Sequence, residues 1–195
     1  MQRAGVLASG NGTILQALLD CAQDAYRVVA VASNNPRARA LERAGSRGID
    51  AAFIRDGGAL LAHFQAHNVD FVILDGYMRM LGADFVEFYR NRIINAHCSL
   101  IPAFCGKGFY GLKVHEAVLE RGVKVTGATV HFVNEEYDAG PIILQKAVPV
   151  EDGDTPETLQ QRVLREAEWL IVPEAARLFA EGKLRIEGNR VAVTE

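Results

Sequence analysis

The feature that most constrains this chain is a regular alternation of short apolar runs with helical segments along its first half. Apolar runs occur at residues 6–8, 28–33, 51–54, 69–74 and 93–97. Between them, apolar residues recur at the three- and four-residue spacing of a helix face. This rhythm predicts an α/β fold, a Rossmann-like open and mostly parallel sheet with helices on both faces.

The pattern changes after Pro102. Residues 126–133 and 141–150 alternate apolar and polar side chains, which predicts an antiparallel C-terminal strand pair. A last long helix then begins near Pro156 and is expected to kink at Pro173. No linker, repeat or low-complexity tract interrupts the sequence, so we expect a single domain over residues 1–195.

Composition excludes several classes of function. A net charge of −3 gives no reason to expect nucleic acid as a partner. No apolar run approaches the length that crosses a bilayer, and no signal peptide is recognisable at the N-terminus. The three cysteines are odd in number and fit neither a zinc site nor a disulfide framework. We expect a cytoplasmic protein with small-molecule substrates, no membrane partner and a monomeric or homodimeric state.

Polar residues follow several of the predicted strands. Gly10, Asn11, Gly12 and Thr13 lie between the first strand and the first helix. Backbone N–H groups of such a turn and the helix N-terminus can bind an anion. The spacing is not that of a dinucleotide loop, so a monophosphate fits better than a pyrophosphate, and a tight turn without a ligand is an equal alternative.

Asn95 and His97 are two residues apart in a predicted strand, so their side chains share one side. An imidazole near a carboxylate, such as Asp138 of the acidic loop 134–140, suits proton transfer, and an amide N–H can stabilise an oxyanion. These groups fit acyl or formyl transfer by direct attack of an amine. A half-buried strand with two bonded polar groups is the structural alternative. A Cys98–His97 nucleophile is disfavoured because neighbours on a strand point apart.

The residues at 9–13, 74–79, 95–102 and 131–141 resemble, in the same order, those of the phosphoribosylglycinamide formyltransferase family within the folate-dependent formyltransferases. The resemblance covers nearly the whole chain. It implies that a formyl group passes from 10-formyltetrahydrofolate, a co-substrate, to the glycine amine of glycinamide ribonucleotide in purine biosynthesis. No cluster of His, Cys and Asp with metal-ligand spacing is visible, so no metal is expected.

The resemblance also implies roles for single residues. Asn95 would bind the formyl oxygen, His97 would act as general acid or stabilise the oxyanion, and Asp138 would hold His97 and help to move the amine proton. Glu168 would receive the substrate amine. The N-terminal half would bind the ribonucleotide phosphate through residues 10–13, and Arg165, from the last long helix, would also reach this phosphate. The C-terminal half would supply catalysis and folate binding. The expected folate contacts are Met78, Arg79, Met80, Leu81, Asn134, Glu135 and Tyr137.

Three residues depart from the pattern of the family: Cys98 replaces a proline, Asp75 a small residue and Ile14 an asparagine. Loss of the proline is expected to loosen the turn after His97 slightly. Asp75 is expected to be either a solvated loop residue or a new contact.

Two other histidines are interpreted as structural. His131 alternates with apolar neighbours and is expected to be a core or supporting residue. His115 opens a helix and is expected at the surface. Lys107, in a glycine-rich loop, fits a phosphate contact and a solvated position equally well.

Two rival functions remain open. Formyltetrahydrofolate deformylase uses a similar trio, although that family normally carries an N-terminal regulatory domain and lacks this phosphate loop. A catalytically silent folate or nucleotide binder would explain the three departures. Methionyl-tRNA formyltransferase fits less well, because it requires a C-terminal RNA-binding domain and a basic surface.

Overall fold

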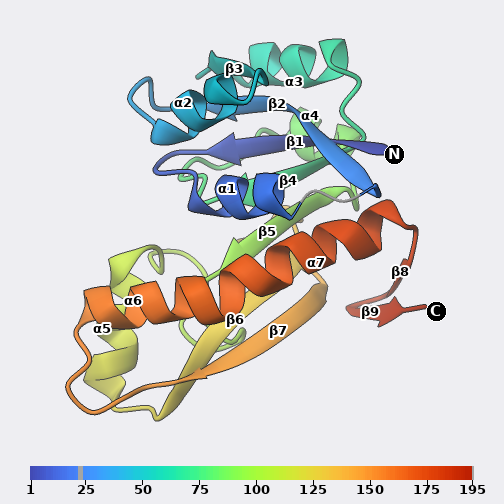
Figure 1. The fold of residues 1–195 in the computed structure, drawn as a ribbon. Helices are drawn as coiled ribbons and strands as arrows, with labels where there is room; N and C mark the ends of the chain where they lie inside the picture. The colour runs from blue at the N-terminus through green and yellow to red at the C-terminus, as the bar shows by residue number, and fades with distance from the viewer. Residues whose placement is uncertain (22–23, 195) are drawn as a thin grey trace.

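The computed structural model describes residues 1–21 and 24–194, and within them nine strands form one sheet in the order β3-β2-β1-β4-β5-β6-β7-β9-β8 (Figure 1). The strands are β1 Gln2–Ala8, β2 Tyr26–Ser33, β3 Asp50–Phe53, β4 Phe71–Asp75, β5 Ile93–His97, β6 Val125–Phe132, β7 Ile142–Pro149, β8 Leu184–Glu187 and β9 Arg190–Val193. The helices are α1 Thr13–Asp20, α2 Arg39–Ser46, α3 Gly57–Ala66, α4 Ala83–Phe88, α5 Leu112–Arg121, α6 Pro156–Val163, the π-helical turn η1 Leu164–Glu168 and α7 Trp169–Ala180.

Strands β1 to β5 are all parallel, which confirms the prediction from the sequence rhythm. The chain runs outward from β1 to β3 and then returns to place β4 on the other side of β1. Ligands of open α/β sheets bind at the carboxyl ends of strands where the order reverses in this way. The register sets Ala8 beside Asp75 and Leu74 beside Asn95, so the polar residues after these strands share one edge.

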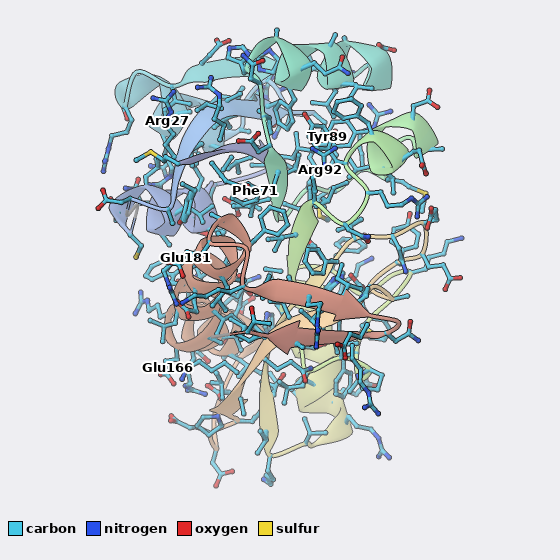
Figure 2. The ribbon with its side chains drawn as sticks, turned by 90° about the vertical axis from the view of Figure 1, so that its right-hand side faces the viewer. Arg27, Phe71, Tyr89, Arg92, Glu166 and Glu181 are labelled. Carbon is cyan, nitrogen blue, oxygen red and sulfur yellow. The ribbon has the colours of Figure 1, made fainter. Side chains whose placement is uncertain are left out.

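Helices cover both faces of the sheet because its central strands are apolar on both sides. In β1, Ala4, Val6 and Ala8 pack into the core that also holds α1, α2, α5, α6 and α7, whereas Leu7 packs into the core under α3 and α4. Figure 2 shows Phe71 inside the molecule and Glu166 at its surface. No helix among the described residues is long and apolar enough to cross a membrane.

The strand pair of β6 and β7 is antiparallel, as predicted, whereas the bridge from β7 to β9 is parallel. Strand β6 runs antiparallel to both of its neighbours, β5 and β7. In the pairing with β5, Asn95 lies directly across from His131. The short hairpin of β8 and β9 then extends the sheet through one bridge between β9 and β7. Consequently the loop that carries Asp138, between β6 and β7, lies beside the end of β5.

The last long helix begins with a capping box, in which the Thr155 side chain accepts from Thr158 N and Thr158 caps in return. Its irregular segment was predicted at Pro173, but the departure from α-helical bonding is the π turn at 164–168, and Pro173 lies inside α7. Leu170 follows the three- and four-residue spacing of the apolar residues of this helix, but it is 56% exposed. The extra residue of a π turn rotates the following side chains, which a fixed helical period does not anticipate.

Candidate active site

Two adjoining cavities open at the carboxyl edge of the sheet, one of about 870 Å³ and one of about 300 Å³. The larger is lined by the glycine loop after β1, the end of β4 and the last long helix. The smaller lies between residues 77–86 and the loop 133–138. Asn95, Tyr137 and Asp138 line both cavities, so the predicted catalytic residues lie where the two meet.

Asn95 is oriented by a histidine on the neighbouring strand. His131 is 2% exposed, and its Nδ1 lies 2.8 Å from the carbonyl oxygen of Phe132. Because a carbonyl only accepts, Nδ1 carries the proton and Nε2 can accept from Asn95 Nδ2, 3.1 Å away. The second N–H of the Asn95 amide remains for an oxygen in the cavity. His131 was expected to be a core or supporting residue, and its supporting contact is this bond.

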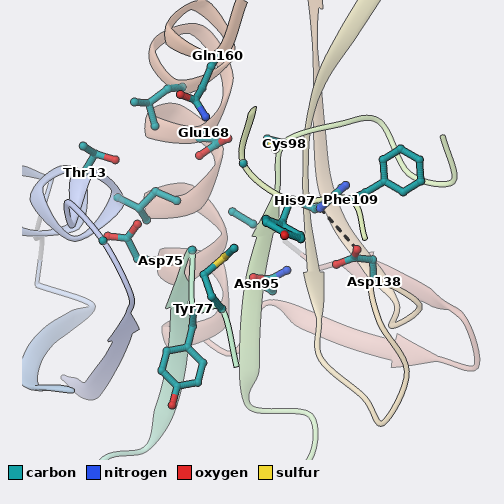
Figure 3. A pocket seen from close by; sticks show the side chains of 18 of the residues that line it. Thr13, Asp75, Tyr77, Asn95, His97, Cys98, Phe109, Asp138, Gln160 and Glu168 are labelled. Atoms are coloured by element: carbon teal, nitrogen blue, oxygen red, sulfur yellow. Dashed lines mark ion pairs between the residues drawn. The ribbon is translucent and has the colours of Figure 1, made fainter. Parts of the chain in front are cut away.

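His97 and Asp138 lie close together in the larger cavity. His97 Nδ1 lies 3.6 Å from Asp138 Oδ2, and both side chains are largely buried (Figure 3). His97 Nε2 lies 2.8 Å from the carbonyl oxygen of Phe104 and therefore donates to it. Burial alone would raise the pKa of Asp138, but His97 and the Gly106 N–H, at 2.8 Å, help to lower it. Asp138 is thus a carboxylate at neutral pH and acts on His97 through its charge.

The turn after His97 is held by side chains of the antiparallel strands. Thr129 Oγ1 donates to Ser99 O at 2.7 Å and accepts from Ile101 N at 3.0 Å. Gln145 Nε2 donates to both Thr129 Oγ1 and Ile101 O. These bonds fix the backbone turn that follows His97 and Cys98.

The glycine loop delivers the N-terminus of α1 to the larger cavity. Gly12 is the N-cap of α1 with φ of 69°, and no side chain within the helix caps it. A Cβ on Gly12 would lie 2.7 Å from Ala40 Cα, so only glycine fits here. Gly10, Asn11, Gly12 and Thr13 all line the cavity, as the expected phosphate site requires.

Asp75 is buried and makes a new contact, rather than being a solvated loop residue. Its Oδ2 accepts from Leu15 N at 2.9 Å, so it caps α1 from the end of β4. Burial raises the pKa of Asp75 to about 6, opposed by the N–H groups of Leu15 and Ile14 and by the charge of Arg43. The Asp75 carboxyl group therefore lies against the first turn of α1, next to the predicted phosphate loop.

Glu168 points into the same cavity from the π turn (Figure 3). Burial and then the charge of Asp75 raise its pKa to about 7. Arg165, expected to reach the phosphate, is exposed and lines neither cavity. Gln160, Leu164 and Glu168, four residues apart, face the cavity together, and Arg165 within the π turn does not join them. The structure therefore does not bring Arg165 to the expected phosphate site.

The residues expected to bind folate gather around the smaller cavity. Its lining includes Arg79, Met80, Leu81, Asn134, Glu135 and Tyr137, and Met78 lines the larger one. Arg79 donates to the carbonyl oxygen of Arg55 at 2.9 Å, and Glu135 pairs with Arg90 at 2.7 Å. Lys107 lines the larger cavity too.

His115 and Cys98 also line the larger cavity, although neither was predicted as part of the site. His115, expected at the surface, is fully buried; burial and then the charge of His97 lower its pKa to about 4. It is the fourth residue of α5, where spacing alone does not reveal which face is covered. Burial raises the pKa of Cys98, so its thiol is neutral and unsuited to nucleophilic attack.

Taken together, an open α/β sheet, a glycine loop and an Asn–His–Asp trio at the junction of two cavities define a group-transfer enzyme domain. The sequence profile described as "Formyl transferase" matches residues 2–175. The chain belongs to this formyltransferase family.

Named relatives narrow the comparison. The chain is similar to phosphoribosylglycinamide formyltransferase of Haemophilus influenzae, with 35% identity over 97% of this chain and 92% of that protein. It is 41% identical to the bovine trifunctional purine biosynthetic protein adenosine-3 but spans only 20% of its length. The solved structure of glycinamide ribonucleotide transformylase 1 from Symbiobacterium toebii is 47% identical, covers 100% of this chain and 95% of that one, and gives a TM-score of 0.93.

The rival hydrolase is a more distant neighbour. A formyltetrahydrofolate deformylase structure from Pseudomonas syringae is 28% identical, with a TM-score of 0.87, and this chain covers 66% of it. The fold is therefore common to both enzymes, and the two activities have to be distinguished by the residues that line the cavities.

Proposed function

We propose that this protein is a phosphoribosylglycinamide formyltransferase, which transfers the formyl group of 10-formyltetrahydrofolate to the amine of glycinamide ribonucleotide. The observation that carries this proposal is the position of Asn95 and Asp138 in the common wall of two cavities. A hydrolase needs one organic substrate and water, whereas a second large compartment with a helix N-terminus suits a second, phosphorylated substrate.

The chemistry follows from the groups at the junction. The substrate amine attacks the formyl carbon, and the carbonyl oxygen becomes an oxyanion that the second N–H of Asn95 stabilises. His97 assists, either by donating a proton to this oxyanion or through its positive charge, and the Asp138 carboxylate holds the His97 ring in place. The proton leaves the attacking nitrogen through Asp138, and the tetrahedral intermediate collapses with the C–N bond to the folate broken and the folate nitrogen protonated.

Glu168 and the glycine loop are proposed to hold the ribonucleotide. The N–H groups at Gly12 and Thr13 face the larger cavity and favour a phosphate at the N-terminus of α1. Glu168 accepts a hydrogen bond from the glycine amine. Because its pKa is about 7, it is partly protonated in the empty site, and a bound ammonium group would favour its ionised form.

The folate is proposed to occupy the smaller cavity against Arg79, Leu81 and the backbone of the 134–138 loop. We further propose that residues 1–195 act as one domain, in the cytoplasm, as a monomer or homodimer without nucleic acid or membrane partners. The net charge of −3 supports the absence of non-specific binding to nucleic acid.

The deciding experiment is an assay with 10-formyltetrahydrofolate in the presence and absence of glycinamide ribonucleotide. We expect the formyl absorbance of the folate to fall only when the ribonucleotide is present, with formylated product in equal amount. Release of formate without the ribonucleotide would identify a hydrolase. Binding of both ligands without turnover would identify a silent binder.

A further inference from the structure

A cluster of metal-ligating side chains lies at the opposite edge of the sheet from the cavities. Asp50 begins β3, His63 lies on α3 and His67 is the C-cap of α3. One ligand atom of each lies within 4.8 Å of the other two. Strand β3 is the outer strand of the parallel half, at the top of Figure 1. The sequence predicted no cluster with metal-ligand spacing; the i, i+4 histidine pair was the signal that was overlooked.

The hydrogen bonds of His67 leave its other nitrogen aimed at Asp50. Nδ1 lies 2.8 Å from the carbonyl oxygen of His63 and must donate to it. Nε2 lies 2.7 Å from Asp50 Oδ2, and two acceptors so close need a proton or a cation between them. An imidazole whose Nδ1 is fixed by a backbone carbonyl while Nε2 faces outward is the usual arrangement of a metal ligand.

The position of His63 is not explained by an ion pair between Asp50 and His67. Its Nε2 is buried and has no hydrogen-bond partner among the described residues. The His63 and His67 rings are 4.7 Å apart between centroids, so both face the same region one helical turn apart. An Asp50–His67 ion pair would need no second imidazole at this place.

We propose that Asp50, His63 and His67 form a zinc-binding site that fastens the edge strand β3 to α3. Two imidazoles and one carboxylate are a ligand set that Zn²⁺ accepts, with water in the fourth position. Ligand atoms of a tetrahedral zinc are roughly 3.3 Å apart. The side chain of Asp50 is 56% exposed and free to move outward from 2.7 Å to that spacing.

Zinc binding is tested on the full chain after treatment with EDTA, by calorimetric titration with zinc chloride and by thermal unfolding with and without zinc. We expect one equivalent to bind per chain and to raise the melting temperature. Added Co²⁺ should give visible absorption bands typical of a tetrahedral site. Absence of zinc binding by the wild-type chain, or of any thermal shift, would overturn the proposal.

Two variants separate this site from other metal-binding groups. His63→Gln keeps the Asp50–His67 pair and should bind zinc at least about tenfold more weakly. Cys21→Ser removes an exposed thiol and should bind as the wild type does. Equal affinity in His63→Gln and wild type would refute the site. Turnover of the folded His63→Gln chain, measured without zinc, should equal that of wild type because the cluster lies away from both cavities, which distinguishes loss of the ligand from loss of the fold.

Discussion

Asn95 on β5 and His131 on β6 face each other across an antiparallel strand pair, with Asn95 Nδ2 3.1 Å from His131 Nε2. His131 in turn is fixed by its donation to Phe132 O. The strand register thus determines the orientation of the amide that is proposed to bind the formyl oxygen. A residue that touches no substrate is expected to control catalysis through this bond.

Replacement of His131 by leucine should lower kcat by roughly 10²-fold, because the Asn95 amide loses the acceptor that orients it. The KM for the ribonucleotide should change little. His131→Asn, which can still accept a hydrogen bond, should recover part of the rate. Steady-state kinetics check this expectation, and an unchanged kcat in His131→Leu would show that Asn95 is oriented by other contacts.

Loss of either His97 or Asp138 should greatly reduce the rate of turnover. His97→Ala and Asp138→Asn should each reduce kcat by about 10²–10⁴-fold. The double variant should be little worse than the single ones, since the two residues act together. Calorimetric titration with the ribonucleotide serves as the control, because its affinity should be nearly unchanged. Near-normal rates in both single variants would contradict the mechanism.

Asp75 should destabilise the protein at neutral and higher pH. Its pKa is raised from 3.8 to about 6, so its stabilising contribution is complete below pH 3.8 and is lost as the pH rises through 6. Asp75→Asn keeps an acceptor for Leu15 N but does not titrate. It should exceed wild type by about 1–3 kcal/mol in free energy of unfolding near pH 8 and match it in acid, as measured by urea unfolding. An equal difference at every pH would exclude titration of Asp75 as the cause.

The same substitution should alter the pH dependence of activity. The charge of Asp75 contributes to the raised pKa of Glu168, about 7, so its removal should lower that pKa. Glu168 would then stay ionised in more acidic solution, and the acidic limb of the kcat/KM profile should move to lower pH. Glu168→Gln is the control, since it should remove that limb. A limb that stays in place in Asp75→Asn would show that another group produces it.

Gly12 and Gly10 offer a matched pair of substitutions in the proposed phosphate loop. Gly12→Ala places a Cβ 2.7 Å from Ala40 Cα at a positive φ, whereas a Cβ at Gly10 meets nothing within 4 Å. Gly12→Ala should cost roughly 1–2 kcal/mol from the backbone conformation alone and raise the KM for the ribonucleotide. Gly10→Ala should have near-normal stability in thermal unfolding. Equal stability of the two variants would show that the loop shifts at Gly12 to make room for the added Cβ.

The parallel sheet, the strand pair and the placement of Asn95, His97 and Asp138 could be predicted because each depends on local periodicity and on strand ends that share an edge. The burial of His115 and the capping of α1 by Asp75 could not. Both depend on contacts between segments far apart in the sequence. The position of Arg165 outside both cavities could not be predicted either, because packing decides between α- and π-helical bonding and spacing does not record that choice.

The π turn at 164–168 has a consequence for redesign of this domain. Each residue of an α-helix advances by about 100°, so one additional residue sets α6 and α7 out of phase with each other. Their buried faces, Leu159 and Val163 before the turn and Val172 and Ala176 after it, both reach the core. Deletion of one residue from the turn would straighten the hydrogen bonding but rotate either Glu168 or the core face of α7 away from its place. The Glu168 carboxylate in the cavity and the buried face of α7 are therefore coupled through the single extra residue of this turn.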